Sequence, residues 1–220
     1  PWGIWRRDLR AAYDASLRPQ TTPGSVKLES IVTALSSMLP HDAIMTNGAG
    51  NYAAFLHRYF AYKSYPAQLA PVSGSMGYGL PAAIAAKLAE PNRTVVAFAG
   101  DGCLQMTAQE LMTAVQFGLP IVIIVANNGT LGTIRMHQER RYPGRVVATS
   151  LMNPDFVAFA LSCGAHGERV TETDAFAAAL ERALQAQRPA IIELALDIEA
   201  ISPRETIQSI RAAAPKRNDT

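Results

Sequence analysis

The sequence predicts an α/β fold, doubly wound, in which a largely parallel sheet carries helices on both faces. Residues 94–99 and 121–126 are continuous apolar runs rich in valine and isoleucine, and residues 190–196 form a third apolar run. Such runs are typical of strands that are covered on both faces. Helical patterns lie between them, and this alternation predicts right-handed strand–helix–strand crossovers.

The N-terminal region predicts a helix that stands apart from this alternation. Residues 1–18 form an amphipathic pattern, and the sequence begins at Pro1 without a methionine. We therefore expect residues 1–24 to be a helix and a linker left from a preceding domain. Apolar side chains then recur at helical spacing, which predicts a helix over residues 25–38.

Shorter patterns follow before the first long run. A brief apolar run predicts a strand over residues 43–46, and a helix is expected over residues 51–60. Glycine and serine dominate residues 73–79, which predicts a turn. Pro81 precedes the helical pattern of residues 82–89, and the first turn of a helix tolerates a proline there.

Between the first two long runs, Thr107 and Glu110 have the spacing of a capping box. They predict a helix over residues 108–117 that stops near Gly118 and Pro120. Strand, helix and strand then form one crossover unit.

The second half of the sequence continues the alternation. Asn153 is expected to cap a helix that ends near residue 163, and Thr173 is expected to cap another that ends near residue 187. Residues 168–170 predict a short strand, and residues 203–214 predict a closing helix.

Composition and length narrow the function classes. The 220 residues suffice for one domain with its own core, which we place at residues 25–200, followed by a C-terminal helix and tail at residues 201–220. A net charge of +2 with scattered basic residues gives no support for a nucleic-acid partner.

No apolar run approaches the roughly 18 residues that span a bilayer, so no membrane partner is expected. Cys103 and Cys163 form no CxxC pair, which favours a reducing cytoplasm over a disulfide framework.

Polar residues follow two of the predicted strands at the points where the strands end. Gly100, Asp101 and Gly102 follow the first long run, and Asn127 and Asn128 follow the second. Ligands of open parallel sheets bind beyond the carboxyl ends of the strands, near a topological switch point. A carboxylate and an amide oxygen there are suitable ligands for Mg²⁺, which takes about six oxygens, usually including phosphate oxygens and waters.

Each motif alone is also ordinary turn chemistry, because Asp between glycines and paired asparagines both favour turns. Their combination is more specific: residues 103–126, with a predicted helix and a buried strand, separate the two motifs. This arrangement resembles the signature of thiamine-diphosphate-dependent enzymes. The segment SGSMGYGLPAA at residues 73–83 and the asparagine region resemble the acetolactate synthase and benzoylformate decarboxylase superfamily. The resemblance covers residues 26–196 and points to the C-terminal, diphosphate-binding domain.

The resemblance implies a set of ligands for thiamine diphosphate and Mg²⁺. The metal ligands would be Asp101, Asn128 and the main-chain carbonyl of Thr130. The residues implied at the cofactor are Ala49, Asn51, Tyr52, Gly74, Met76, Gly100, Gly102 and Cys103. Main-chain donors at a loop that leads into a helix suit a diphosphate anion.

Within that set, Met76 matches the bulky apolar residue that, in the family, holds thiamine in its bent shape. The Gly74 carbonyl would accept from the aminopyrimidine. In the family, a glutamate on a separate pyrimidine-binding domain activates the cofactor, and this sequence shows no counterpart. The catalytic residue is therefore unknown here, and we expect the partner to be a pyrimidine-binding domain of the same or another chain, in a homo-oligomer.

The function implied is that of a lyase or carboligase, acting on 2-oxo acids, of which this chain is the cofactor-binding portion. Thr133 and His137 depart from the acetolactate synthases, which have a larger residue and a tryptophan there. The side chains of Arg135, His137, Gln138 and Arg140 fit either a substrate channel or a solvated helix surface.

Two other classes of function stay open at this point. A nucleotide-dependent oxidoreductase would need a G-x-G-x-x-G turn, and the sequence GDGCLQ lacks its third glycine. A non-catalytic domain that binds the cofactor or assembles with itself would keep the fold without turnover.

Overall fold

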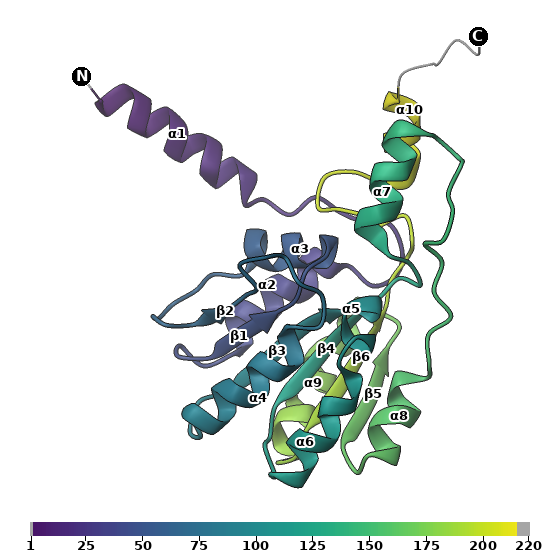
Figure 1. Cartoon of the computed structure of the whole chain (residues 1–220). Helices are drawn as coiled ribbons and strands as arrows, with labels where there is room; N and C mark the ends of the chain where they lie inside the picture. The colour runs from purple at the N-terminus through teal and green to yellow at the C-terminus, as the bar shows by residue number, and fades with distance from the viewer. Residues whose placement is uncertain (1, 215–220) are drawn as a thin grey trace.

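The computed structural model describes residues 2–214 and is built around one sheet (Figure 1). Six strands lie in the order β2-β1-β3-β4-β6-β5, and every neighbouring pair is parallel. The strands are β1 (Ile44–Asn47), β2 (Gln68–Leu69), β3 (Val95–Gly100), β4 (Val122–Asn127), β5 (His166–Val170) and β6 (Ala190–Ala195). The predicted doubly wound α/β fold is confirmed.

The register aligns the carboxyl ends of the central strands. Gly100 at the end of β3 pairs with Ala126 of β4, and Asn127 at the end of β4 pairs with Ala195 of β6. Parallel strands place their carboxyl ends at one edge, so the loops that follow β3 and β4 emerge side by side. The order of the strands reverses between β1 and β3, which puts a topological switch point at the same edge.

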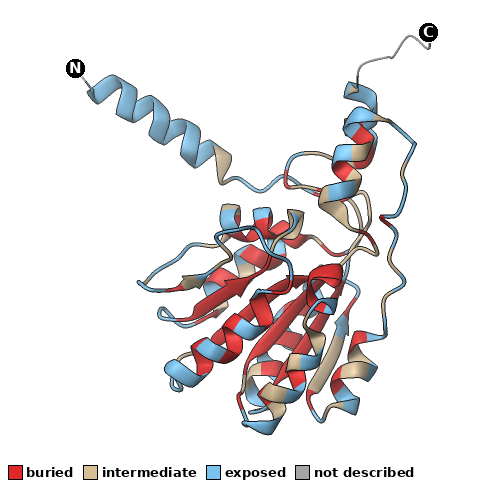
Figure 2. Ribbon diagram, viewed as in Figure 1, coloured by how far each residue is buried: buried red, intermediate tan, exposed pale blue. Residues whose placement is uncertain are grey.

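Helices cover both faces of the sheet, which explains the unbroken apolar runs. The strands β3 and β4 are buried along almost their whole length (Figure 2). Val96 and Phe98 belong to one core cluster, while Val95, Ala97 and Ala99 belong to the other. The first cluster includes residues of α2 (Leu28–Met38), α3 (Asn51–Tyr59) and α9 (Phe176–Gln185), and the second includes residues of α4 (Gly79–Ala89), α6 (Leu111–Gln116) and α8 (Phe156–Ser162).

A separate layer lies beyond the carboxyl edge of the sheet, where α7 (Gly132–Arg141) packs against α10 (Ile207–Ala213) (Figure 1). Its small core consists of Met136, Ile201, Ile207 and Ile210. The side chain of Glu139 is fully buried in this layer and accepts hydrogen bonds from Arg211 at 2.6 and 2.7 Å.

The N-terminal helix α1 (Gly3–Ser16) is present as the sequence predicts, but it buries none of its residues. It extends away from the sheet and is exposed along most of its length (Figure 2). Trp2, just before the helix, and Trp5, within it, are both exposed. Its origin in a preceding domain stays a prediction, and Pro1 lies outside the described residues. Within residues 2–214, no helix combines the length and the apolar character that crossing a bilayer requires.

Three predicted helix caps are wrong, each because the capping side chain has a partner elsewhere. A 3₁₀ turn, η1 (Ala108–Glu110), precedes α6, and the Thr107 hydroxyl donates to the Gly77 carbonyl. Asp155 caps α8 in place of Asn153. Helix α9 begins only after the turn η2 (Thr173–Ala175), because the Thr173 hydroxyl donates to the Ser25 carbonyl instead of capping the helix.

Two short elements were not predicted from the sequence: strand β2 and helix α5 (Asp101–Gln105). The closing helix is shorter than expected, because α10 begins after a capping box formed by Thr206 and Ser209. Of the predicted C-terminal tail, residues 215–220 lie outside the described residues. The proposed division at residues 25–200 stays a prediction.

We predict that Arg211→Gln lowers the free energy of unfolding, because it leaves the buried Glu139 carboxylate without its main partner. Arg211 is itself 42% exposed, so we expect about 2 kcal/mol, below the roughly 3–5 kcal/mol of a fully buried pair. The hydrogen bonds from Arg211 hold the pKa of Glu139 below its usual value. That contribution is present above the pKa of the unfolded chain and is lost as the pH falls through the folded pKa.

Urea unfolding of wild type and variant at neutral and acidic pH measures both effects. The difference between the two proteins should shrink in acid. Arg10→Gln is the matched control, because it removes an exposed pair with Asp14 on α1 and should change stability by less than about 0.5 kcal/mol. Equal stability of Arg211→Gln and wild type at neutral pH would contradict the assignment.

Candidate functional site

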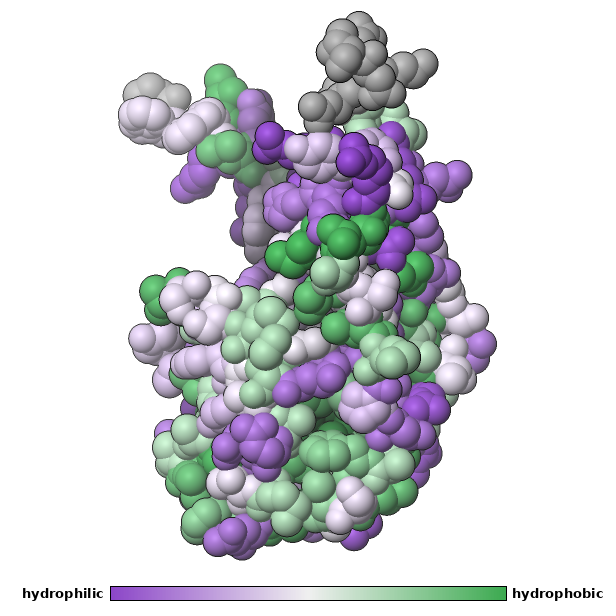
Figure 3. All heavy atoms as spheres, turned by 45° about the vertical axis from the view of Figure 1, so that its right-hand side comes forward, coloured by the Kyte–Doolittle hydropathy of each residue, from purple (hydrophilic) through white to green (hydrophobic). Residues whose placement is uncertain are grey.

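A cavity of about 250 Å³ opens at the carboxyl edge of the sheet. Its walls come from the loops after β1, β3 and β4, from residues 74 and 76 ahead of α4, and from residues 196–201. On the face shown in Figure 3, hydrophobic side chains gather below the largely hydrophilic surface of α7 and α10. The cavity therefore lies where the strand pattern predicted a ligand site.

The structure brings all the predicted site residues to the lining of this one cavity. They are Ala49, Asn51, Tyr52, Gly74, Met76, Gly100, Asp101, Gly102, Cys103, Asn128 and Thr130. Their roles toward a cofactor or a metal stay predictions.

Asp101 is the first residue of α5 and is only 3% exposed. Its Oδ1 accepts from the Gly102 amide at 2.9 Å, and its Oδ2 accepts from the Gly129 amide at 2.9 Å and from Asn153 Nδ2 at 2.8 Å. Burial raises the pKa of this carboxyl, while the hydrogen bonds oppose the rise. Within the described part of the chain Asp101 forms no ion pair. A cation bound at this carboxylate would offset the cost of its burial.

Asn128 and Thr130 lie in the loop after β4, where Gly129 adopts a positive φ of 64°. Asn128 Oδ1 accepts from the Thr130 amide at 3.3 Å. The backbone on either side of Thr130 pairs with an antiparallel segment, since Leu131 donates to the Thr149 carbonyl and the Leu151 amide donates to Gly129. In that pairing the carbonyl of Thr130 points away from the neighbouring segment, which leaves it available as an oxygen ligand.

The Tyr52 side chain lies close to Gly48, just after β1, and to Gly100, at the end of β3. A Cβ atom at Gly100 would lie 2.7 Å from its ring, so only glycine permits this approach. The Tyr52 hydroxyl donates to Cys103 Sγ at 3.1 Å, and the Gly77 amide donates to the same sulfur at 3.2 Å. Burial raises the pKa of Tyr52 above its usual value, which keeps the hydroxyl protonated as a donor. The thiol thus joins α3, α5 and the loop that carries Met76.

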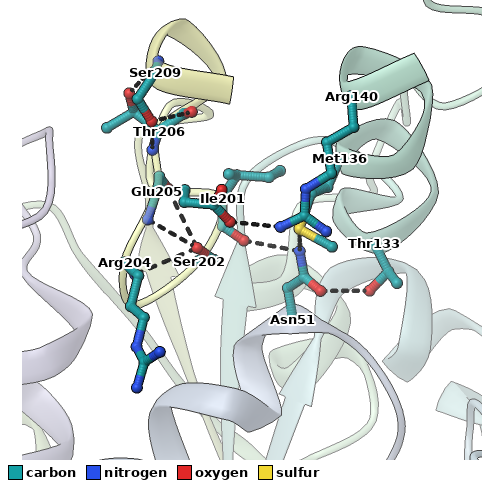
Figure 4. A network of polar contacts seen from close by, with 10 residues as sticks. All are labelled: Asn51, Thr133, Met136, Arg140, Ile201, Ser202, Arg204, Glu205, Thr206 and Ser209. Carbon is teal, nitrogen blue, oxygen red and sulfur yellow. Dashed lines mark hydrogen bonds and ion pairs between the residues drawn. The ribbon is translucent and has the colours of Figure 1, made fainter. Parts of the chain in front are cut away.

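The side chain of Asn51 is used within the protein (Figure 4). Its amide nitrogen donates to the Ile201 carbonyl at 2.9 Å, and its oxygen accepts from the Thr133 hydroxyl at 2.9 Å. These bonds fasten the start of α3 to α7 and to the C-terminal segment. Any contact of Asn51 with a diphosphate would therefore be made by its main chain at the start of α3.

Met76 and Gly74 lie in a loop at the mouth of the cavity, where Gly74 has a positive φ of 70° and Met76 is 38% exposed. The loop is held through Gly77, whose carbonyl accepts from Thr107 and whose amide donates to Cys103. The bond from Thr107 therefore positions the loop, although the sequence suggested a helix cap.

The polar residues of α7 are mostly engaged in structural contacts. Arg135 approaches buried Glu139 at 3.7 Å, Gln138 bonds with the backbone of Val147, and Arg140 pairs with Glu205. His137 is exposed. Of the α7 residues considered from the sequence, Thr133 alone lines the cavity. The exposure of His137 and Arg140 favours a solvated helix surface for them, whereas Arg135 is only 16% exposed and lies beside Glu139.

Sequence reasoning missed Asn127 and Asn153 as a pair at this site. Asn153 Nδ2 donates to Asp101 Oδ2 and, at 2.7 Å, to Asn127 Oδ1. The signal in the sequence was an asparagine before a proline, which also fits a helix cap. Its distance of 52 residues from Asp101 hid the contact.

Comparison with known proteins identifies relatives of this domain. The family model described as "Thiamine pyrophosphate enzyme, C-terminal TPP binding domain" matches residues 48–194. The acetolactate synthase isozyme 2 large subunit of Escherichia coli (strain K12) is 35% identical over 170 residues, which cover 76% of this chain and 31% of that protein. The acetolactate synthase large subunit of Corynebacterium glutamicum is 33% identical over 207 residues, 90% of this chain and 33% of that protein.

A solved structure shows the same fold. The thiamine diphosphate-dependent 4-hydroxybenzoylformate decarboxylase of Rhodococcus jostii RHA1 superposes with a TM-score of 0.76 at 29% identity, over 82% of this chain and 34% of that one. The chain spans about a third of the length of the curated relatives it matches.

We predict that Gly100→Ala destabilises the protein, because the new methyl group would meet the Tyr52 ring at 2.7 and 2.8 Å. The ring is held by Cys103 and by packing on Phe98, so we expect a loss of about 1–3 kcal/mol, typical of overpacking. Urea unfolding measures it. Gly3→Ala, which has open space around its Cβ position, is the control and should stay within about 0.5 kcal/mol of wild type. An unchanged Gly100→Ala protein would contradict the close approach.

Proposed function

Because the chain belongs to the thiamine pyrophosphate enzymes, as the match to their C-terminal TPP binding domain shows, we propose that its cavity binds thiamine diphosphate through Mg²⁺. We propose further that the whole enzyme acts on 2-oxo acids, as a decarboxylase or carboligase. The observation that carries the proposal is the buried Asp101 carboxylate, which lies beside Asn128 and Thr130 and has no cationic partner among residues 2–214.

The donor set fits Mg²⁺. Asp101 offers a carboxylate oxygen, Asn128 an amide oxygen and Thr130 a main-chain carbonyl, which are all hard oxygen ligands. Diphosphate oxygens and water would complete the roughly six ligands that the ion takes. A simple turn does not require a charge to be buried. Burying a carboxylate costs free energy unless it is paired, so the burial of Asp101 supports a cation site over a simple turn.

The diphosphate would lie against main-chain donors at the start of α5. The Gly102 amide already donates to Asp101 Oδ1, so the amide of Cys103 is the donor we expect to reach the anion. The start of α3, at Asn51 and Tyr52, approaches the cavity from the opposite wall. Helix N-termini favour anions at both places.

Bound thiamine diphosphate supplies an electron sink for breaking or forming a carbon–carbon bond beside a carbonyl group. The residues of this chain bind and orient it: Asp101 and Asn128 hold the charged end, and Met76 lies at the mouth to support the ring. Among residues 2–214, Asp101 is the one carboxylate that lines the cavity, and we assign it to the cation. The activating glutamate is therefore proposed to come from a pyrimidine-binding domain.

Exposed apolar side chains around the mouth support such a partner domain. Val72, Tyr78 and Met106 are exposed near the loop that carries Met76. Exposed apolar surface of this kind marks interaction sites. We propose that a pyrimidine-binding domain of the same chain or of another copy in a homo-oligomer covers it.

The names of the relatives support a 2-oxo acid substrate, since benzoylformate is a 2-oxo acid and one relative is a 4-hydroxybenzoylformate decarboxylase. The departures at Thr133 and His137 favour a substrate other than that of the acetolactate synthases. A domain that binds the cofactor without turnover is the second candidate. Turnover of pyruvate and benzoylformate by this chain joined to a pyrimidine-binding domain separates the two.

We predict that Asp101→Ala abolishes Mg²⁺-dependent binding of thiamine diphosphate, because it removes the carboxylate proposed at the ion. Asn128→Ala should weaken binding in the same direction. Calorimetry with and without Mg²⁺ measures both variants. Since burial raises the pKa of Asp101, binding by wild type should also weaken as the pH falls through that raised pKa.

Asp42→Ala is the control for that experiment, because Asp42 is exposed and lies outside the cavity. It should bind the cofactor as wild type does. Unchanged affinity in Asp101→Ala would refute the metal site.

We also predict that this chain alone gives no thiamine-dependent turnover, even with Mg²⁺ and cofactor in excess. The reason is that, in the part of the chain that the structure describes, no carboxylate other than Asp101 lines the cavity, and activation of the cofactor needs one beside the aminopyrimidine. Exchange of the proton on the thiazolium carbon, followed by NMR with and without the protein, tests this. Strong acceleration by the chain alone would mean that one of its own carboxylates reaches the pyrimidine.

A further inference from the structure

We propose that Asn153 is a positioning residue that orients the Asp101 carboxylate toward the cation, with Asn127 as its second support. The inference rests on the proposed function and deepens it. Asn153 does not line the cavity, so it would act through Asp101 and not on the cofactor itself.

The amide group of Asn153 is fully engaged. Its nitrogen donates to Asp101 Oδ2 at 2.8 Å and to Asn127 Oδ1 at 2.7 Å, and its oxygen accepts from Gln105 Nε2 at 2.6 Å. An amide nitrogen carries two hydrogens in fixed directions, so the two acceptors are held in a fixed relation to each other.

Two carboxylates determine which way these amides face. An ionised carboxylate only accepts hydrogen bonds, so Asn127 Nδ2 must face Glu193, to which it donates at 2.7 Å. The oxygen of Asn127 then faces Asn153. Asp101 is likewise an acceptor, and Asn153 must therefore present its nitrogen to both.

Glu193 anchors the far end of this chain of contacts. It lies on β6, is only 4% exposed, and also accepts from Arg169 Nε at 2.9 Å. Glu193 thereby fixes the orientation of the Asn127 side-chain amide. Asn127 in turn orients the amide of Asn153, which donates to Asp101.

The consequence concerns the rotation of the Asp101 side chain. The Gly102 amide holds Oδ1, while Gly129 and Asn153 hold Oδ2. Asn153 is the one side chain among these donors, and without it Oδ2 is held by the Gly129 amide alone, so the carboxylate is oriented less firmly. Loss of partners that orient a metal ligand typically costs about 10–100-fold in metal affinity.

Helix capping does not account for Asn153. Asp155 caps α8 by accepting from the amides of Val157 and Ala158. Asp155→Ala therefore disturbs the same segment of chain, and it also removes the contact of Asp155 with Arg169 at 3.2 Å. It leaves the hydrogen bonds of Asn153 to Asp101 and Asn127 in place, which makes it a matched control.

The test measures binding of Mn²⁺, as a spectroscopic stand-in for Mg²⁺, to the full chain with thiamine diphosphate by electron paramagnetic resonance. Asn153→Leu, which keeps the size and removes the donor, should weaken Mn²⁺ binding by about 10–100-fold. At saturating Mn²⁺ the affinity for thiamine diphosphate should return to that of wild type. Asp155→Ala should bind Mn²⁺ as wild type does.

Two further variants keep the test decisive if Asn153→Leu does not fold. Asn153→Ser, which is smaller and shorter, should also weaken Mn²⁺ binding. Asn127→Leu should do so to a lesser extent, and the double variant should lose less than the sum of the two because both act on one contact chain.

The outcomes separate this inference from the proposed function. If wild type does not bind Mn²⁺ with thiamine diphosphate, the proposed function fails and the inference fails with it. If wild type binds and the Asn153 variants bind equally well, the inference alone is overturned. A loss that excess Mn²⁺ does not restore, or that Asp155→Ala reproduces, would show a structural role and also overturn it.

Discussion

The burial of the Asp101 carboxylate at the carboxyl edge of the sheet is the constraint on which the site depends. A buried charge must be hydrogen-bonded or paired, and here the donors are two amides of the backbone and one side-chain amide. Those donors require α5 to begin directly at the end of β3 and require the loop after β4 to turn back at Gly129. The arrangement of both loops therefore follows from one carboxylate.

Parallel register makes this arrangement possible. Because β4 lies beside β6, Asn127 contacts Glu193 directly, and Asn153 joins Asn127 to Asp101 at the end of β3. The central strands are buried on both faces, because alternate side chains enter two separate cores. These buried strands support the loops that form the site.

The layer of α7 and α10 depends on a second buried charge, Glu139, and on the side chain of Asn51, which ties it to α3. This layer forms one wall of the cavity through Thr133 and Ile201. The apolar residues Val72, Tyr78 and Met106, near the loop that carries Met76, are exposed. We propose that a partner domain covers them.

The sequence by itself determined the doubly wound sheet, because strand burial and helix periodicity are local patterns, and the motif at two strand ends pointed to residues that the structure brings to one cavity. Tertiary structure decided where the short polar side chains donate. Thr107 and Asn153 have the spacing of helix caps, yet Thr107 bonds to Gly77 and Asn153 to Asp101. A cap contributes only about 1 kcal/mol, so a buried acceptor far along the sequence outcompetes it, and no local pattern records that acceptor.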